Sequence, residues 1–192
     1  YMMNYRFILV RIFVLFLSIF IILISLPLLL FIYLLIKFKY GSPLFFQERV
    51  GKNLKKFKLI KFRTMRIGTK DCPTHLVDNS RITPIGKIIR KTKIDEIPQF
   101  FNVLKGEMSI VGPRPCLVTQ KELIKQRKKL NIHQFTPGIT GLAQIKGVDM
   151  SNPKLLAELE FSMIKSFTIK KYFYYFFKTL LGSGFGDKFI KE

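Results

Sequence analysis

The chain has 192 residues, of which 48% are hydrophobic and 23% charged, and its mean hydropathy is +0.22. This length allows one domain, or one membrane segment followed by one small domain. The formal charge of +21 predicts a polyanionic partner, such as acidic lipid, a phosphorylated substrate or nucleic acid. Cys72 and Cys116 are far apart, with only His75 and His133 to join them, which argues against a disulfide scaffold or a zinc site and favours reduced thiols.

An uncharged apolar segment runs from Ile12 to Ile36 and is interrupted mainly by Ser18, Ser25, Pro27 and Tyr33. A straight helix of these 25 residues would be about 37 Å long, enough to cross a hydrocarbon core of about 30 Å. The segment is too long for a cleaved signal peptide. Pro27 lacks an N–H and crowds the carbonyl of Leu23, so we expect a kink there, with Ser25 bonding a freed carbonyl.

Basic residues flank this segment on both sides, with Arg6 and Arg11 before it and Lys37 and Lys39 after it. One of the two clusters would have to cross the bilayer if the helix spanned it. A broken helix that enters and leaves on the cytoplasmic face would keep both clusters inside, and a plain kinked transmembrane helix is the alternative. Either way, the heavier basic flank after the segment predicts that the rest of the chain is cytoplasmic.

The stretch from Lys37 to Asp71 contains eleven Lys or Arg and two acids. Residues 57–63 mix apolar and basic side chains as a short strand would, after a turn at 51–53. Such a surface suits anionic lipid. Phe57 and Phe62 among the basic residues can also form a stacking platform for nucleic acid. The membrane segment directly upstream favours lipid, so we expect no nucleic-acid partner.

Two adjacent acids, Asp95 and Glu96, follow a predicted short basic helix that ends near Lys93. Asp95 suits a helix N-cap, Pro98 is tolerated in the first turn, and apolar residues then predict a buried stripe until Gly106: Ile97, Phe100, Phe101 and Leu104. Capping alone explains acids at a helix start. A carboxylate nucleophile beside a metal ligand is also what phosphate transfer requires.

Three later segments complete the pattern. Residues 106–111 predict a strand that leads to Gly112-Pro113-Arg114-Pro115, where two prolines fix the direction of one guanidinium. Residues 137–144 (PGITGLAQ) predict a compact loop whose N–H groups can face a phosphate. Six consecutive aromatic residues lie between lysines in 170–178 and predict an interfacial helix, with a core helix as the alternative. Gly182, Gly184 and Gly186 then end regular structure.

Five motifs in this order resemble the monotopic phosphoglycosyl transferases, which are bacterial sugar transferases of the undecaprenyl-phosphate type. The motifs are KFRTM (61–65), DEIPQ (95–99), FNVLKGEMS (101–109), GPRP (112–115) and PGITGLAQ (137–144). The resemblance implies a mostly helical α+β fold with a re-entrant membrane helix (1–38), a cytoplasmic catalytic domain (39–192) and amphipathic interfacial helices. The implied location is the bacterial inner membrane, with the catalytic domain facing the cytoplasm.

The resemblance also implies a reaction. A sugar 1-phosphate would pass from a UDP-sugar to undecaprenyl phosphate, with Mg²⁺ present and UMP released, at the start of cell-surface glycan assembly. Asp95 would attack phosphorus and form a covalent intermediate, Glu96 and Asp95 would hold Mg²⁺, and Arg114 would meet phosphate. The further candidates for substrate or phosphate binding are Lys61, Arg63, Gly138, Thr140, Gln144 and Glu160.

Two features depart from the family pattern. The helix break of the family is commonly an adjacent Ser-Pro, whereas a leucine separates Ser25 from Pro27 here. Glu160 is the match for an acid that the family usually follows with aromatic residues, which are missing. A non-catalytic basic anchor that binds acidic lipids or nucleic acid is the alternative function. The sequence predicts neither the sugar nor the oligomeric state.

Overall fold

The computed structural model describes residues 5–69 and 79–181, so Cys72, His75 and the three glycines after residue 181 lie outside the described residues. The α-helices and strands follow in the order α1 (Tyr5–Tyr40), β1 (Leu44–Val50), β2 (Lys56–Phe62), α2 (Pro84–Lys91), α3 (Gln99–Leu104), β3 (Ser109–Val111), β4 (Cys116–Leu117), α4 (Lys121–Lys129), β5 (Gly138–Thr140), α5 (Leu142–Ile145), α6 (Pro153–Lys165) and α7 (Ile169–Leu180). Short 3-10 turns occur at Lys52–Leu54, Asn79–Arg81, Ile94–Glu96 and Ile132–Gln134. This is a mostly helical α+β fold, as expected.

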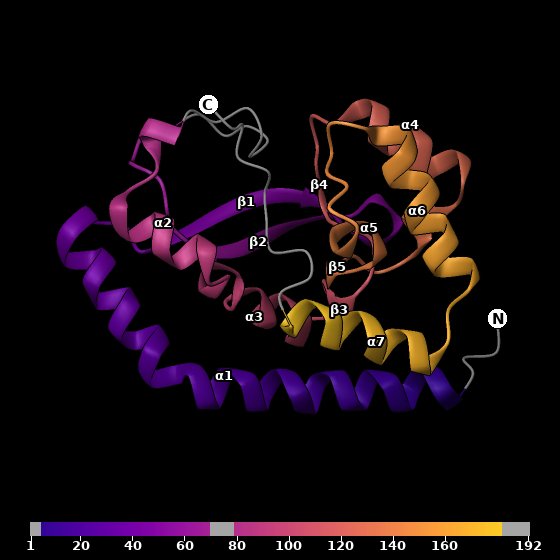
Figure 1. Cartoon of the computed structure of the whole chain (residues 1–192), viewed down its shortest axis with the longest axis horizontal. Coiled ribbons are helices and arrows are strands. Elements are labelled where there is room, and N and C mark those ends of the chain that lie inside the picture. Colours follow the sequence, from indigo (N-terminus) through magenta and orange to yellow (C-terminus); the bar gives the residue numbers. More distant parts are fainter. Residues whose placement is uncertain (1–4, 70–78, 182–192) are drawn as a thin grey trace.

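Helix α1 lies along one side of the molecule beneath α3 and α7, and it bends along its length (Figure 1). Its segment Ile8–Tyr40 is the one helix in the described chain that is long and apolar enough to cross a membrane. Pro27 lies inside the helix, where its missing N–H leaves the carbonyl of Leu23 without its helical donor. The sequence predicts that Ser25 bonds one of the carbonyls freed by this break. Its hydroxyl instead donates to the carbonyls of Ile21 at 2.6 Å and Ile22 at 3.3 Å.

Two small sheets position the loops of the chain. Strands β1 and β2 form an antiparallel hairpin from Leu44↔Phe62 to Val50↔Lys56, and β4 pairs with the end of β1. The predicted strand at 57–63 is therefore confirmed, one residue earlier. The turn between β1 and β2 includes the turn predicted at 51–53, where Asn53 is in the left-handed region at φ 54°. The outer edge of β2 is closed by Asn102, whose side chain accepts from the N–H of Ile60 at 3.0 Å and donates to the carbonyl of Lys58 at 2.8 Å.

The second sheet pairs β3 with β5 in parallel, with Ser109 opposite Gly138 and Val111 opposite Thr140. The ladder continues past β3, because the N–H of Gly112 donates to Thr140 and the N–H of Gly138 donates to Pro113, both at 2.9 Å. A Cβ at Gly138 would lie 2.1 Å from the Gly112 nitrogen, so the close approach of these two segments requires glycine. The segment 137–144, expected as a loop, is thus a strand followed by a one-turn helix.

The helix expected at Asp95 begins four residues later, at Gln99. A capping side chain at Asp95 would need the N–H of Ile97 or of Pro98. The N–H of Ile97 already bonds to Ile94, and Pro98 has none. Asp95 therefore lies in a 3-10 turn and caps nothing, which corrects the capping interpretation. Further along α3, Phe101 is exposed, whereas Asn102, which bonds to β2, and its neighbour Val103 are buried. The predicted buried stripe is therefore also partly wrong.

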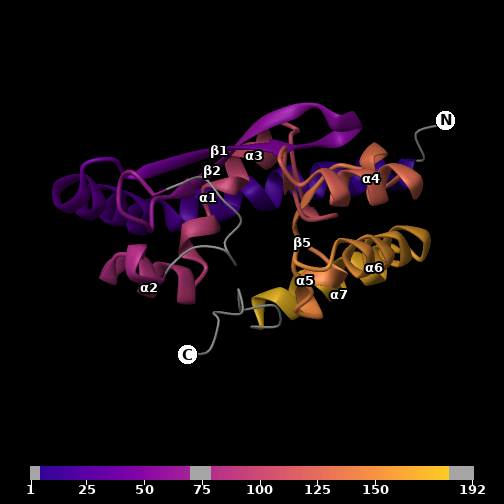
Figure 2. The ribbon, with the colours of Figure 1, turned by 90° about the horizontal axis from the view of Figure 1, so that it is seen from above.

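Both halves of α1 pack against the domain that follows it in the chain. The first half contributes Val14 to a core cluster with residues of β2, α3, β3, α6 and α7. The second half contributes Leu29, Ile32 and Ile36 to a cluster with Phe62 and Ile89. Figure 2 shows α2 on one side of the molecule and α5, α6 and α7 together on the other.

The aromatic helix α7 has one buried side and one exposed side. Tyr172 and Tyr175 are buried in the core, whereas Tyr174 and Phe177 are more than half exposed, at 51% and 54%. Tyr172 also ties α7 to β3, since its hydroxyl lies 3.3 Å from the Ser109 hydroxyl. The buried side confirms that α7 contributes to the core, and the interfacial role of its exposed aromatic side stays a prediction.

Candidate active site

A cavity of about 410 Å³ lies between the two sides of the molecule and brings together residues that are far apart in sequence. Four predicted site residues line it: Glu96, Arg114, Thr140 and Gln144. Its remaining wall comes from α1, the turn after α2, α3, β3, β5 and α7: Ile21, Thr92, Lys93, Ile97, Phe100, Ile110, Ile139, Phe176 and Thr179. The cavity therefore has charged groups on the side of the acidic pair and an apolar lining that continues to α1.

The acid pair occupies the 3-10 turn Ile94–Glu96, which the left-handed residue Lys93 (φ 59°) introduces. Glu96 faces the cavity and forms an ion pair with the Lys61 ammonium at 3.0 Å, with the two side chains 18% and 22% exposed. Lys61 comes from β2, so the strand brings the predicted cation to the predicted acid. Asp95 is only 6% exposed and is not part of the cavity wall, although its neighbours are.

The two carboxyl groups have opposite pKa shifts. Burial, followed by the neighbouring charge of Glu96, raises the pKa of Asp95 from 3.8 to about 6, although nearby cations oppose this shift. Burial also acts to raise the pKa of Glu96, but the positive charges of Lys61, Lys93 and Arg114 outweigh it and lower that pKa to about 2. Glu96 is therefore a permanent anion, and Asp95 is the more basic carboxylate.

Arg114 follows β3 and is held through its backbone. Its N–H donates to Glu160 at 3.0 Å, and its carbonyl accepts from the Arg127 guanidinium at 2.6 Å. Its side chain reaches the cavity and is one of the charges that lower the pKa of Glu96. The two prolines around it and the β3–β5 ladder fix where it leaves the sheet.

Besides Asp95 and Lys61, three further candidates lie away from the cavity wall. Arg63 donates to the carbonyls of Ser42 at 3.0 Å and Leu44 at 3.3 Å, so it joins the end of α1 to β1. Gly138 serves the close backbone approach of the β3–β5 ladder. Glu160 is 1% exposed and is paired with buried partners rather than facing the cavity.

The structure adds site residues that the sequence interpretation did not single out. Lys93 lies next to the acid pair in the sequence, so its position was a usable signal. Thr179 lies in the aromatic segment, where nothing pointed to the cavity, yet its hydroxyl contacts that of Thr140. Gln144 was predicted, and neither polar atom of its buried amide has a hydrogen-bond partner among the described residues. An unpartnered buried amide on a cavity wall is typical of a group that a ligand satisfies.

The donor set fits Mg²⁺. Asp95 and Glu96 are adjacent carboxylates, and Oδ1 of Asp95 has no hydrogen-bond partner within residues 5–69 and 79–181. In the same part of the chain there is no cluster of three or more His, Cys, Asp or Glu that forms a complete metal cage. Mg²⁺ commonly binds through one or two carboxylates together with substrate phosphates, so a Mg²⁺ ion at this pair stays a prediction.

Comparison with known proteins identifies relatives over most of the chain. A sequence model of the family described as bacterial sugar transferase matches residues 5–184. The galactosyl transferase CpsE of Streptococcus agalactiae serotype III (strain NEM316) is 48% identical over 120 residues, which are 56% of this chain and 26% of that protein. An uncharacterized sugar transferase, EpsL of Bacillus subtilis (strain 168), is 44% identical over 141 residues, or 73% of this chain and 69% of EpsL.

A third relative carries a more specific name. The UDP-N-acetylgalactosamine-undecaprenyl-phosphate N-acetylgalactosaminephosphotransferase of Aeromonas hydrophila is 37% identical over 167 residues, which are 80% of this chain and 39% of that protein. The matched region is thus about a quarter of CpsE and less than half of the Aeromonas protein.

Proposed function

The chain belongs to the bacterial sugar transferase family, and we propose that it transfers a sugar 1-phosphate from a UDP-sugar to undecaprenyl phosphate, with release of UMP. The Aeromonas relative, which matches 80% of this chain, is named for a UDP-sugar donor and this lipid carrier. The cavity suits both reactants, because charged groups at Glu96 and Arg114 adjoin an apolar lining that includes Ile21 of the membrane helix.

The observation that carries this proposal is the opposite pKa shift of the two adjacent acids. A carboxylate with a raised pKa is the better nucleophile, and one with a depressed pKa is the better permanent ligand for a cation. With a pKa of about 6, Asp95 is mostly ionised at pH 7 and still basic enough to attack phosphorus. Glu96, with a pKa of about 2, stays anionic beside Lys61 and Arg114. We therefore assign the nucleophile to Asp95.

Two displacements at phosphorus account for the reaction. In the first, a carboxylate oxygen of Asp95 attacks the phosphorus that bears the sugar, and UMP leaves with the electron pair of the broken diphosphate bond. In the second, a phosphate oxygen of the polyprenol attacks the same phosphorus, and the bond to Asp95 breaks to return its carboxylate. Since Lys93, Glu96 and Ile97 line the cavity and Asp95 does not, the first step requires the Asp95 side chain to turn toward the bound donor.

Other groups of the site bind and orient the donor. Arg114 lines the cavity, and its guanidinium would contact phosphate oxygens, while Lys61 holds Glu96 through their ion pair at 3.0 Å. The unpartnered Gln144 amide and the Thr140 hydroxyl offer uncharged donors and acceptors for the sugar or the nucleoside. Mg²⁺ held by Asp95 and Glu96 would neutralise phosphate charge.

We further propose that α1 enters and leaves the membrane on one face, the cytoplasmic one. A straight helix over Ile8–Tyr40 would separate its ends by about 50 Å. Near the start of α1, however, the Arg11 guanidinium donates to the carbonyls of Val103 at 2.7 Å and Met108 at 3.2 Å. Near the other end, Ile36 is buried against the same domain. Both ends of α1 thus stay with the catalytic domain, which supports a re-entrant helix.

The outer side of α1 suits lipid contact. Phe16, Leu23 and Phe31 are each exposed by more than 60%. Apolar side chains exposed to this extent along a helix are typical of a membrane-facing surface.

The test is release of UMP by the chain in detergent or nanodiscs, with UDP-sugars and polyprenol phosphate as substrates. Asp95→Asn is expected to abolish turnover, because an amide is not a usable nucleophile. Incubation of the wild-type chain with a donor radiolabelled in its sugar, without acceptor, is expected to label Asp95 covalently. The matched control is Glu158→Gln, an exposed carboxylate on α6. Near-normal turnover by Asp95→Asn would refute the assignment, and label on Glu96 would move the nucleophile there.

Removal of divalent cations tests the metal. Treatment with EDTA is expected to stop UMP release and added Mg²⁺ to restore it. Full activity after EDTA treatment would exclude a required divalent cation.

A further inference from the structure

A fully buried ion pair lies behind the active site, between α4 and α6. The Arg127 guanidinium donates to Glu160 through two nitrogens, Nε to Oε2 at 2.8 Å and Nη2 to Oε1 at 2.6 Å. The Arg127 and Glu160 side chains are 8% and 1% exposed. This two-point contact is the geometry in which a guanidinium and a carboxylate hold each other most firmly in direction as well as distance.

The same two side chains hold both polar groups of the Arg114 peptide backbone. Glu160 Oε1 accepts from the Arg114 N–H at 3.0 Å, and Arg127 Nη2 donates to the Arg114 carbonyl at 2.6 Å. Arg114, Arg127 and Glu160 are 13 to 46 residues apart in the sequence, so the clamp exists only in the folded chain. We call this arrangement the Arg127–Glu160 clamp.

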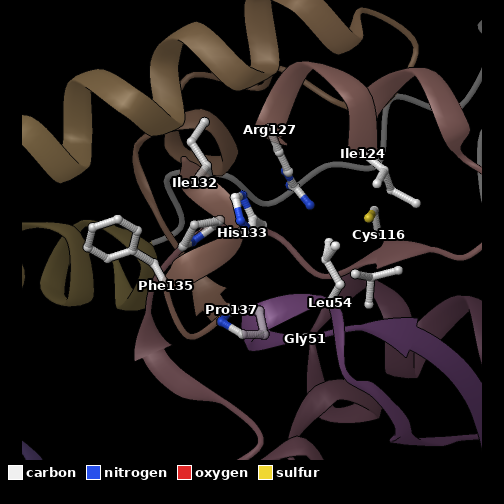
Figure 3. Close-up of a pocket in the computed structure, with 11 residues that line it drawn as sticks. Gly51, Leu54, Cys116, Ile124, Arg127, Ile132, His133, Phe135 and Pro137 are labelled. Atoms are coloured by element: carbon white, nitrogen blue, oxygen red, sulfur yellow. The ribbon is translucent and has the colours of Figure 1, made fainter. Parts of the chain in front are cut away.

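On the side away from the active site, Arg127 borders a small cavity with few polar neighbours. Arg127 and Pro113 line a second, much smaller cavity together with Cys116, Ile124 and Ile132. Figure 3 shows the Arg127 side chain extending from α4 beside Cys116 and His133. This cavity holds about 20 Å³, room for one water at most, so little empty space lies beside Arg127 there.

The stability of the fold alone does not explain the presence of this buried ion pair. The desolvation of two buried charges commonly offsets their attraction, and apolar replacements of similar size are often as stable. What the clamp does supply is a backbone held at both polar groups of Arg114, which lines the cavity together with Glu96. We propose that Arg127 and Glu160 are positioning residues that hold Arg114 for its contact with donor phosphate. This inference rests on the proposed function, and it gives Glu160 an indirect role in place of the direct substrate contact expected from the sequence.

The central variant replaces both charges at once, as Arg127→Met with Glu160→Leu, so that no lone charge stays buried. We expect this double variant to keep its thermal midpoint within a few degrees and to lose on the order of 100-fold in kcat/KM for UMP release, because a small displacement of a positioned group has effects of that size. Arg127→Lys keeps the charge but cannot make all three contacts at once, and we expect an intermediate loss.

A double-mutant cycle that combines the Arg127/Glu160 variant with Arg114→Ala separates a positioning role from a general structural effect. If the clamp acts through Arg114, the double variant is expected to cause less than about a threefold further loss in the Arg114→Ala background, because the group that it positions is already gone. The matched control is Leu123→Ala, a residue of α4 that is 1% exposed and packs in the neighbouring core cluster. We expect it to lower the thermal midpoint but to leave the kcat/KM of the folded protein unchanged.

Two results would overturn the inference. The first is a kcat/KM of the double variant that stays within about threefold of the wild-type value. The second is a loss in kcat/KM from the double variant that is as large in the Arg114→Ala background as in the wild-type background. If the double variant fails to fold, Arg127→Lys takes its place in the cycle, and the same two outcomes apply to it. The absence of any UMP release by the wild-type chain would instead refute the proposed function, and the clamp's role with it.

Discussion

Replacement of Asp95 with Asn is expected to stabilise the fold at pH 7 while it removes the proposed nucleophile. The Asp95 carboxyl is buried, and burial and the charge of Glu96 raise its pKa from 3.8 to about 6. The ionised carboxylate is therefore less favourable in the native state than in the unfolded chain. Asn has nearly the same shape and no charge, so the variant avoids this unfavourable term.

The size of the effect follows from proton linkage. The native state binds a proton at Asp95 more tightly than the unfolded chain does, so wild-type stability falls as pH rises from about 4 to about 6. A pKa difference of about 2 units corresponds to about 3 kcal/mol at pH 7, to about 1.6 kcal/mol at pH 5 and to about 0.5 kcal/mol at pH 4. For a chain of this length, 3 kcal/mol raises the thermal midpoint by about 6 to 12 °C.

The assay is thermal unfolding followed by circular dichroism, since the chain contains no tryptophan to serve as a fluorescent probe. Wild type, Asp95→Asn and the exposed control Glu158→Gln are compared at pH 4, 5 and 7 in one detergent. The expected result is a gain for Asp95→Asn that is largest at pH 7 and nearly gone at pH 4, with no comparable trend for the control. A lower midpoint at pH 7, or an equal gain at all three values, would refute the reasoning.

Three further perturbations follow from the structure. Lys61→Met removes the cation that is paired with Glu96 and that also lowers the pKa of Asp95. The pKa of Asp95 is therefore expected to rise, and the acid limb of the pH profile of kcat/KM is expected to move to higher pH. An acid limb that does not move would contradict this. Asn102→Leu breaks the bonds that close the edge of β2 and is expected to lower the free energy of unfolding by about 2 to 4 kcal/mol, measured in urea. Single cysteines at positions 8 and 41, with the native cysteines removed, are expected to resist an impermeant thiol reagent in intact cells; external labelling of position 8 alone would show a spanning helix.

Local chemistry was sufficient to predict much of this protein. The uncharged run with Pro27, the strand at 57–63 and the aromatic helix near the end depend on neighbouring residues, and the structure has all three. The co-linear motifs likewise named four of the residues that line the cavity, Glu96, Arg114, Thr140 and Gln144, because the residue types that bind phosphate and cations are few.

Tertiary structure decided the rest. Asp95 caps no helix because the N–H of Ile97 already donates to the carbonyl of Ile94 and because Pro98 has no N–H. The resulting turn buries Asp95 and turns Glu96 to the cavity. Their opposite pKa shifts depend on burial and on cations brought from β2 and from the end of β3, which no local pattern contains. Glu160 shows the same limit. The family resemblance suggested a substrate contact for it, but only packing between α4 and α6 revealed that it holds the backbone of Arg114.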